Sequence, residues 1–338
     1  MCAVARKVTS QDVAREAGVS RSAVSMVLNG RAEGAISAVN QKAVREAAER
    51  LGYRPNRIAQ SLRDQTSHTI GVISDSIVTG AFGGLMLAGA SVRAAESDYV
   101  LLVMGSDGRT DRNAEFIDAL LARQVDGLIY AAEGMTAWAP PRIFRREPHI
   151  LLNAFDPSGG STGVVCDEVE GGYRATRLLL DAGHRDIVAL TGTPDVEATG
   201  RRSAGHQRAL AEAGIRGREL VCGWEIDRGL DLGTRVLEAE DRPTGVVCAN
   251  DRVAAGVLLA AARLGLRVPE DVSVVGYDDD PNVAPQLGLS TVGIPHREMG
   301  VRAVDLLLGS LGEASLPGGE VVVPTPVMRR GSVAPPSR

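Results

Sequence analysis

Residues 8–30, VTSQDVAREAGVSRSAVSMVLNG, contain the start and stop signals of two short helices joined by a tight turn. Thr9 and Asp12 have the spacing of a capping box, in which each side chain accepts a hydrogen bond from the other residue's backbone N–H group, so we expect a helix over 10–17. Ser20 can cap a second helix, and the closing Asn-Gly pair can end it. The stretch therefore predicts a compact helical pair near the start of the chain.

The spacing of Ala14, Gly18 and Val24 suits a helix-turn-helix, because a small residue lets two helices approach, glycine permits the turn and valine packs between them. In this motif the second helix enters the major groove of DNA, where its outward side chains reach base edges. A third helix capped by Ser37 completes the unit. The alternative is an ordinary helical hairpin with a solvated polar face. The outward side chains of the second helix are Arg21, Ser22, Ser25, Met26 and Asn29.

Charge is divided unevenly along the 338-residue chain, whose net charge is −5. Residues 1–64 carry 11 Lys and Arg against 6 Asp and Glu, and the remainder carries 26 against 36. A basic head on an acidic body indicates a polyanionic partner for the head. No apolar run approaches the roughly 20 residues of a membrane-spanning helix, and no signal peptide is recognisable, so we expect a cytoplasmic protein without membrane association.

From residue 70 onward, short apolar runs alternate with longer amphipathic stretches. The runs, which include IGVIS, GLIYAA, DIVALTG and VSVVGYDD, have the continuous hydrophobicity of buried parallel strands. Helical segments separate them, and the runs are too many for one sheet of ordinary size. The predicted fold class is therefore α/β, with two doubly wound parallel-sheet subdomains after an all-α helix-turn-helix head.

Between the head and the body lies YRPNRIAQSLRDQTSHT, residues 53–69. Pro55 stops the preceding helix, and Asn56 can cap a short new helix that is marginal by itself. The segment can be an interdomain linker. It can also be a hinge that folds on DNA and wedges an apolar side chain into the minor groove.

These segments resemble the lac repressor and galactose repressor family of bacterial transcription factors over nearly the whole chain and in the family's order. The stretches that carry the resemblance are VTSQDVAREAGVSRSAVSMVLNG, LGYRPNRIAQSL, CDEVEGGYRATRLLLDAGHRDIVALTG, RPTGVVCANDRVAAGVLLAAARLGLRVPEDVSVVGYDDDP and LSTVGIP. The resemblance implies a ligand-responsive repressor that binds a near-palindromic operator in double-stranded DNA as a homodimer. Such a protein would work at the bacterial nucleoid.

The resemblance also implies roles for residues of the head and hinge. Arg21, Ser22 and Met26 match positions of the recognition helix that read bases. Leu62 matches a leucine that paired hinge helices insert at the centre of the operator. Matches to positions that contact the DNA backbone or cap helices are Thr9, Ser20, Ser25 and Asn29, and further expected hinge contacts are Asn56, Arg57 and Ala59.

The body resembles the family's effector-binding core, which is similar to periplasmic sugar-binding proteins. The resemblance implies three chain crossings between two subdomains, and we place them near 162, 292 and 321. The last strand, EVVVPTPV, then belongs to the second subdomain. The expected parts are a helix-turn-helix domain over 1–54, a hinge helix and linker over 55–67, and a core over 68–338 whose subdomains hold 68–162 with 293–320 and 163–292 with 321–338.

Ligand is expected in the cleft at the carboxyl ends of the strands, where open parallel sheets generally bind ligands. Arg202 matches the family's effector-contacting arginine, Asp278 the carboxylate after the Gly-Tyr pair, and Trp224 an aromatic wall. The set is completed by Asn250, Asp75 and Phe82. Carboxylates and amides pair with vicinal hydroxyls, a guanidinium is a planar donor fork, and a flat ring covers an apolar sugar face. A sugar or related polyhydroxylated effector is therefore expected.

Two of these residues have a plain structural alternative. Asp278 begins a run of three aspartates, and such a charge run is usually a solvated loop. Trp224 by itself fits a core position as well as a ligand wall.

Three features depart from the family pattern. The loop SIVTGAFGG lacks the Asn-Pro of many relatives, which weakens the expectation of a ligand contact at Phe82. His206 stands where an aromatic such as Phe is usual, and we expect it to fill that space rather than to serve as a polar pocket residue. Met26 stands where Arg or His is frequent. A thioether can touch a thymine methyl group but cannot make the bidentate pair of Arg with guanine.

Two other functional classes compete with the repressor. A solute receptor of a transport system would have the body but would need an export signal and no DNA-binding head. A nicotinamide dehydrogenase should show GxGxxG after its first strand, and SIVTGAFGGLMLAG lacks that spacing. We therefore expect no enzymatic activity and no cofactor. Four cysteines without CxxC spacing predict buried thiols rather than a metal site or disulfides.

Overall fold

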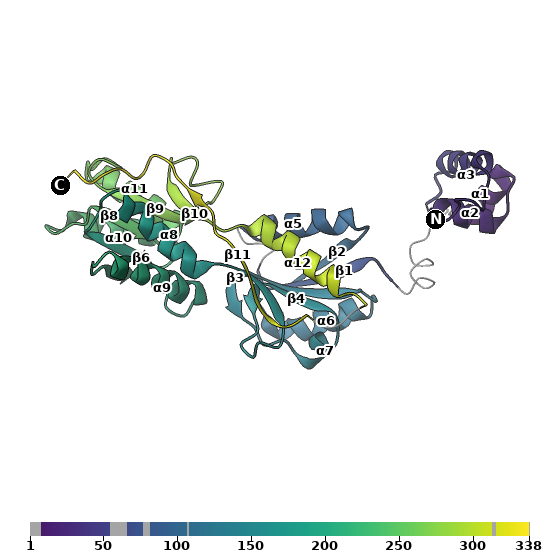
Figure 1. The fold of residues 1–338 in the computed structure, drawn as a ribbon, viewed down its shortest axis with the longest axis horizontal. Coiled ribbons are helices and arrows are strands. Elements are labelled where there is room, and N and C mark those ends of the chain that lie inside the picture. Colours follow the sequence, from purple (N-terminus) through teal and green to yellow (C-terminus); the bar gives the residue numbers. More distant parts are fainter. Residues whose placement is uncertain (1–7, 55–65, 77–81, 107, 313–315, 338) are drawn as a thin grey trace, which may run out of the picture. The chain divides into compact units, whose positions relative to one another are not determined.

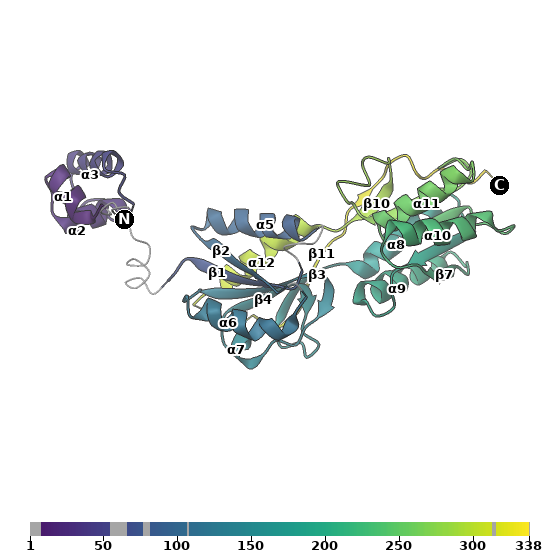
Figure 2. The same ribbon diagram turned by 180° about the vertical axis from the view of Figure 1, so that it is seen from behind.

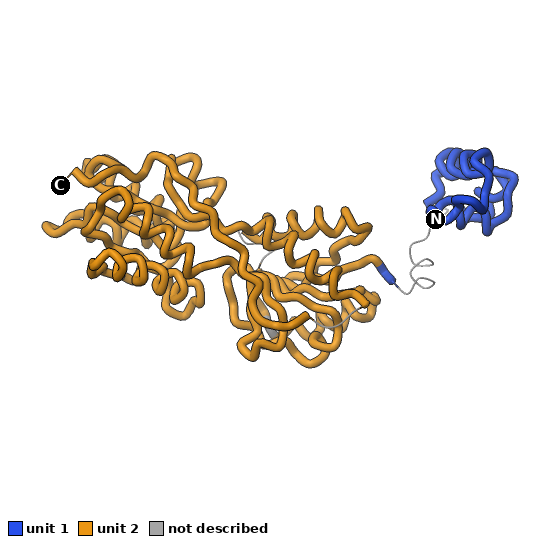
Figure 3. Tube along the Cα trace, in the orientation of Figure 1, with its two compact units in different colours: residues 1–67 blue, residues 68–338 orange. Residues whose placement is uncertain are grey.

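The computed structural model describes residues 8–54, 66–76, 82–106, 108–312 and 316–337. The chain divides into two compact units, one ending at Ser67 and one beginning at His68 (Figure 3), and each is described by itself. Among the described residues, no helix combines the length and the apolar character needed to cross a membrane.

The first unit contains the three predicted helices. Helix α1 spans Ser10–Ala17, α2 spans Arg21–Leu28 and α3 spans Ala38–Arg50. The expected capping box is present, because the Asp12 N–H donates to Thr9 Oγ1 at 3.4 Å and the Thr9 N–H donates to Asp12 Oδ2 at 2.9 Å. Ser20 and Ser37 cap α2 and α3 as predicted, because their hydroxyl oxygens accept from the N–H groups of Ala23 and Asn40.

The core of this unit is small and apolar. Val13, Val24 and Val44 come from the three different helices, and each is at most 1% exposed. Gly18 ends α1 in the left-handed region, at φ +65°, which glycine adopts without the steric penalty of a side chain. Since Val24 faces the core, the opposite side of α2 faces away from the core.

The second unit contains two six-stranded sheets that form separate lobes (Figure 1). The first sheet, in the N-subdomain, is parallel with strand order β11-β5-β4-β3-β1-β2. Helices α5 and α12 pack together on one face, and α6 and α7 lie on the other (Figures 1 and 2). The strands are β1 (Thr69–Ser74), β2 (Val100–Gly105), β3 (Gly127–Ala137), β4 (His149–Phe155), β5 (Thr162–Cys166) and β11 (Gly319–Val323). The helices are α5 (Gly83–Glu96), η1 (Thr110–Arg112), α6 (Asn113–Leu121), α7 (Arg142–Arg145) and α12 (His296–Ser310).

The second sheet, in the C-subdomain, has the order β12-β10-β9-β8-β6-β7, and only the β10–β12 pair is antiparallel. Helices α8 and α9 pack against each other, as do α10 and α11. The strands are β6 (Ile187–Thr191), β7 (Arg218–Val221), β8 (Gly245–Cys248), β9 (Ser273–Asp278), β10 (Ser290–Gly293) and β12 (Val327–Met328). The helices are α8 (Glu168–Asp181), α9 (Glu197–Glu212), α10 (Ile226–Glu238) and α11 (Asp251–Arg263). The predicted α/β class with two doubly wound subdomains is confirmed.

Two of the three expected crossings were placed too early. Strand β5 pairs with β4, and β11 pairs with β5, so both belong to the first sheet. The chain therefore crosses after Cys166 rather than near 162, and between β11 and β12 rather than near 321. The expectation that all of EVVVPTPV lies in the second subdomain was wrong, because its first half is β11. A short apolar run does not encode which of two similar sheets it joins.

The strand order locates the functional end of each sheet. Strand β1 lies between β2 and β3, and β6 lies between β7 and β8, so the winding direction reverses next to these strands. Ligands of open α/β sheets bind beyond the carboxyl ends of the strands at such a reversal. Asp75 follows β1, and Asn250 stands just beyond β8.

Candidate functional site

The outward side of α2 carries the predicted base-reading residues. Arg21 and Ser22 are exposed, and Met26 is half-buried. Arg21 Nε donates to Ser10 Oγ at 3.2 Å, which ties the start of α2 to α1. This side of the helix therefore offers polar groups together with one thioether.

The predicted DNA-backbone contacts lie around the same helix. Thr9 and Ser20 are the N-caps of α1 and α2. Asn29 Nδ2 donates to Ser25 Oγ at 3.1 Å across the last turn of α2. The remaining predicted contacts, which are Asn56, Arg57, Ala59 and Leu62, lie outside the described residues.

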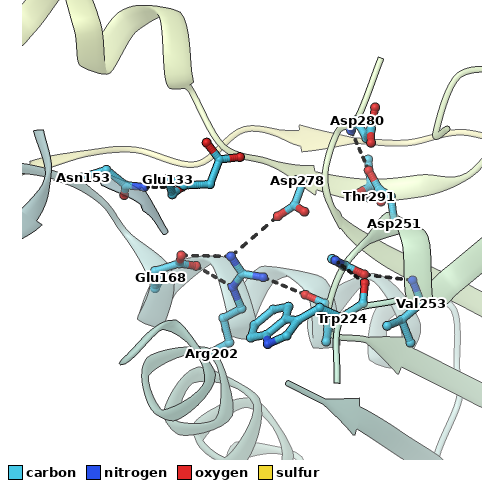
Figure 4. A network of polar contacts seen from close by, with 12 residues as sticks. Glu133, Asn153, Glu168, Arg202, Trp224, Asp251, Val253, Asp278, Asp280 and Thr291 are labelled. Carbon is cyan, nitrogen blue, oxygen red and sulfur yellow. Dashed lines mark hydrogen bonds and ion pairs between the residues drawn. The ribbon is translucent and has the colours of Figure 1, made fainter. Parts of the chain in front are cut away.

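Arg202, on α9, is the centre of a buried ionic network in the core (Figure 4). Its Nε and Nη2 donate to the two carboxylate oxygens of Glu168 at 2.7 and 2.9 Å, and its Nη1 donates to the Ala249 carbonyl oxygen at 2.6 Å. Asp278 Oδ1 lies 3.6 Å from Nη2. The guanidinium carbon lies 3.7 Å from the centroid of the Tyr277 ring. Arg202 is thus held along its edge and over one flat face.

Burial and charge compete in this network. Burial alone would lower the pKa of Arg202, but the charge and hydrogen bonds of Glu168 outweigh it and raise that pKa above its ordinary value. Burial raises the pKa of Asp278 well above its ordinary range, and the attraction of Arg202 only partly offsets this effect. Burial also lowers the pKa of His296 to about 4, so this ring is neutral at pH 7. Arg202 is therefore the one permanent cation of the network.

Trp224 lies against the end of β6, beside Arg202. A Cβ atom at Gly192 would lie 2.1 Å from the indole, so only glycine there lets the ring take this place. Trp224 Nε1 donates to Thr193 Oγ1 at 3.4 Å. Asn250 caps α11 by accepting from the Val253 N–H at 2.8 Å, and its Nδ2 donates to the Trp224 carbonyl at 3.0 Å. Asn250 therefore positions Trp224 through internal hydrogen bonds.

The N-subdomain contributes a chain of contacts that joins the other predicted residues. The Glu133 N–H donates to Asp75 Oδ1 at 3.1 Å, and the Phe82 N–H donates to Glu133 Oε1 at 3.2 Å. The Phe82 ring stacks on His296 with centroids 4.9 Å apart and planes within 4°. Asn153 Nδ2 donates to the Glu133 carbonyl at 3.0 Å. Asp75 and Phe82 thus meet through Glu133, a residue that sequence reasoning missed.

The run of three aspartates that begins at the last residue of β9 is not a solvated loop. Asp278 and Asp280 are 8% and 6% exposed. The Asp280 N–H and the Thr291 hydroxyl each donate to Asp251 at 2.7 Å, and burial raises the pKa of Asp251 to about 7. Asp278 and Asp279 have φ of +102° and +53°, which non-glycine residues seldom adopt. Such strained backbone is concentrated at functional sites.

A cavity of about 40 Å³ lies beneath Arg202 and Trp224, and His206 lines it. His206 is 2% exposed, as expected for a residue that fills space. Its Nδ1 lies 2.7 Å from the Thr176 hydroxyl, which itself donates to the Gly172 carbonyl, so Nδ1 carries the proton. The Nε2 atom has no partner among the described residues. His206 therefore fills the space only in part.

Glu168 and Tyr277 are the principal residues of this site that sequence reasoning missed. Glu168 is the first residue of α8, where an acidic side chain is usual because it faces the positive end of the helix dipole. Its sequence context therefore gave no sign of a partner in α9. Tyr277 lies in an apolar strand, where the sequence pattern predicts that an aromatic residue belongs to the hydrophobic core.

Comparison with known proteins places both parts of the chain. Residues 9–56 match the family model described as bacterial regulatory proteins, lacI family, and residues 176–333 match a periplasmic binding protein-like domain. The HTH-type transcriptional repressor PurR of Vibrio atlanticus is 32% identical over 307 residues, covering 89% of this chain and 91% of that protein. Catabolite control protein A of Priestia megaterium is 30% identical over 325 residues, covering 94% and 96%.

Two solved structures of transcriptional regulators are similar to this chain in fold. The lac repressor dimer bound to operator and the anti-inducer ONPF has a TM-score of 0.79 and 28% sequence identity, and the match covers 97% of this chain and 100% of that one. Catabolite control protein A of Lactococcus lactis has a TM-score of 0.64 and 25% identity, covering 78% and 98%.

Proposed function

Because the chain belongs to the lacI family of bacterial regulatory proteins, we propose that it represses transcription by binding a near-palindromic operator as a homodimer, and that a small molecule in the core changes its affinity for DNA. The observation that carries this proposal is the presence, in one chain, of an outward polar α2 and a buried Arg202 network at the carboxyl ends of the strands. A solute receptor would not need the first of these features. The protein would act at the nucleoid in the bacterial cytoplasm.

In the proposed complex, α2 lies in the major groove and Arg21, Ser22 and Met26 meet base edges. Thr9, Ser20, Ser25 and Asn29 would contact the DNA backbone. Asn56, Arg57, Ala59 and Leu62 would bind at the minor groove between the two half-sites. Two-fold symmetry of the protein then requires two related half-sites in the DNA.

Apolar side chains at the edge of the first sheet support a homodimer. Strand β2 is an edge strand, and its Val100 and Val103 are 61% and 36% exposed. Val92 on α5, which packs next to β2, is 55% exposed. An open edge with apolar side chains promotes association and is normally covered. A second copy of the chain would cover it.

A contact between the subdomains gives the effector a means of action. Arg201, on α9, donates from Nη1 and Nη2 to the two carboxylate oxygens of Glu320 on β11, each at 2.7 Å. Its guanidinium also lies 5.0 Å from the centroid of the Phe155 ring on β4. A sugar-like ligand held by Arg202, Asp278 and Trp224 would favour one arrangement of these contacts. Such differential binding typically shifts DNA affinity by ~1–3 kcal/mol.

Selection of binding sites from random DNA, followed by gel-shift titration of the purified full chain, tests the proposal. We expect enrichment of a palindromic site and a specific affinity about 10³-fold or more above that for random DNA. Absence of any preferred palindrome would contradict the repressor function. An operator affinity that no sugar or nucleoside changes would contradict the sensing function alone.

Met26 should make the operator of this protein differ from those of relatives that carry Arg at this position. We expect weak guanine preference at the base pair that Met26 faces, because a thioether offers no bidentate donor pair. The variant Met26→Arg should gain about 1–3 kcal/mol of discrimination in favour of guanine at that pair. The measurement is site selection with both proteins. A strict guanine in the sites chosen by the unmodified protein would be the contrary result.

A further inference from the structure

The charge around Arg202 points to the chemical class of the effector. Carboxylates approach this end of the core from both subdomains, on Glu133 from the N-subdomain and on Glu168 and Asp278 from the C-subdomain (Figure 4). Asp75 of the N-subdomain accepts a hydrogen bond from the Glu133 N–H group. Arg202 is the one cation among the described residues that contacts this group at hydrogen-bonding distance. A ligand that enters here meets more negative than positive charge.

Arg202 is already bound on the edge that would clamp an anion. Its Nε and Nη2 form the two parallel hydrogen bonds to Glu168, and its Nη1 donates to a backbone carbonyl. These bonds use three of the five guanidinium N–H groups, and the carboxylate of Glu168, which is 3% exposed, already balances the positive charge that would attract a phosphate or carboxylate on the ligand. The geometry therefore disfavours an anionic effector.

Asp278 provides the second, independent observation. The residue is 92% buried, since 8% of its surface is exposed, and no described residue donates a hydrogen bond to its carboxylate. Its one described ionic partner is Arg202, at 3.6 Å. Neither carboxyl oxygen is among the fully enclosed, unpartnered side-chain atoms of the described residues, so the group stays accessible from solvent and can receive a donor from outside the protein.

We propose that the effector carries a protonated amino group that binds the Asp278 carboxylate, so that it is an amino sugar or another amine-bearing polyhydroxylated molecule rather than a phosphorylated or carboxylated one. This inference rests on the proposed function, because it takes the core as the effector site. Arg202 then acts as a fixed hydrogen-bonding wall with Glu168, and Trp224 covers an apolar face of the ligand.

Binding of such a cation should release a proton. Burial keeps the pKa of Asp278 well above its ordinary range in the empty core, and a bound ammonium group would lower that pKa. The carboxyl proton passes to solvent, and a carboxylate–ammonium pair replaces it. Affinity for an amine should therefore rise with pH until Asp278 is ionised in the empty protein, as long as the amine itself stays protonated.

Other groups near Asp278 also titrate or carry charge, so the pH dependence needs a variant to assign it. These groups are Arg202 of α9, Glu168 of α8, Asp251 of α11, Asp280 of the following loop, Tyr277 of β9 and His296 of α12. Asp251, with its pKa of about 7, would contribute to any profile measured near neutrality. If the pH dependence of affinity for an amine arises from Asp278, it should be absent from the Asp278→Asn variant and present in variants at other positions.

The test is calorimetric titration of the full-length protein with matched triplets of glucose, galactose and mannose, each as the neutral sugar, the 2-amino-2-deoxy sugar and the 6-phosphate. We expect an amino member to bind about tenfold or more tightly than its neutral parent and the phosphates to bind worst. Titrations in two buffers of different ionisation enthalpy should show proton release for the amino sugar only.

Two variants make the result specific. Asp278→Asn should weaken binding of the amino member about tenfold more than binding of its neutral parent, and it should abolish the proton release. Glu240→Gln removes one exposed charge from the same subdomain and should change neither. Equal or tighter binding of a neutral or phosphorylated member, or binding of no amine, would overturn the inference. Operator selection in the DNA assay would then show whether the repressor function stands without it.

Discussion

The variant Arg202→Met will lose effector response and will unfold with a free energy about 3–5 kcal/mol lower than that of the unmodified protein at pH 7. The substitution leaves Glu168 and Asp278 buried without their cation. Burial already holds the pKa of Asp278 well above its ordinary range, whereas Glu168 loses both hydrogen bonds from the guanidinium to its carboxylate oxygens. Urea unfolding followed by circular dichroism at pH 7 measures the loss of stability.

The matched control removes the stranded charge. Glu168→Gln combined with Arg202→Met removes the carboxylate of Glu168 together with its cation, so the double variant should recover most of the lost stability without recovering effector response. Replacing a buried ion pair with uncharged groups is often nearly neutral for stability, whereas removing one partner is not. A double variant no more stable than Arg202→Met would refute the assigned role of Glu168.

The variant Gly205→Ala will destabilise the second subdomain by about 3 kcal/mol, the upper end of the usual cost of overpacking. Helices α8 and α9 cross here, and a Cβ atom on Gly205 would lie 1.9 Å from the Val169 carbonyl oxygen. Because that oxygen belongs to backbone, the clash can be relieved only by moving α9 away from α8. Since α9 carries Arg202 and α8 carries Glu168, effector response should weaken as well.

Gly200 supplies a control in the same helix. It is exposed, and a Cβ atom there would meet nothing within 4 Å. Gly200→Ala should therefore stabilise the protein by about 0.4–1 kcal/mol, because alanine loses less conformational freedom on entering a helix. Thermal unfolding of both variants decides the matter. If both variants were destabilised, or both stabilised, the close crossing of α8 and α9 would not be what determines the effect of alanine on stability.

Local signals predicted the head well. The Thr9–Asp12 capping box, the caps at Ser20 and Ser37 and the extent of α1 depend on residues a few positions apart, and the structure contains each of them. The alternation of apolar strands with helices also sufficed for the fold class. These features depend on residues within single helices or strands, so the local sequence is sufficient to predict them.

Long-range pairing limited the prediction of the core. Whether β11 joins β5 or a strand of the second sheet depends on partners more than 150 positions away, and both sheets offer apolar edges. The Arg202–Glu168 pair likewise joins residues 34 positions apart on two helices. Resemblance to a family predicted Arg202 as a site residue, but it did not predict that the Glu168 carboxylate is its partner.

The position of Trp224 has a practical consequence. The chain has two tryptophans, and the indole of Trp224 lies 5.8 Å from the Arg202 guanidinium, whereas Trp138 stacks on Tyr130 at 3.9 Å in the other subdomain. Indole emission responds to nearby charge and to water, so a molecule that enters beside Arg202 will alter the fluorescence of Trp224 and leave Trp138 as an internal reference. The protein therefore carries its own optical reporter of effector occupancy, and candidate ligands can be screened without attaching a dye.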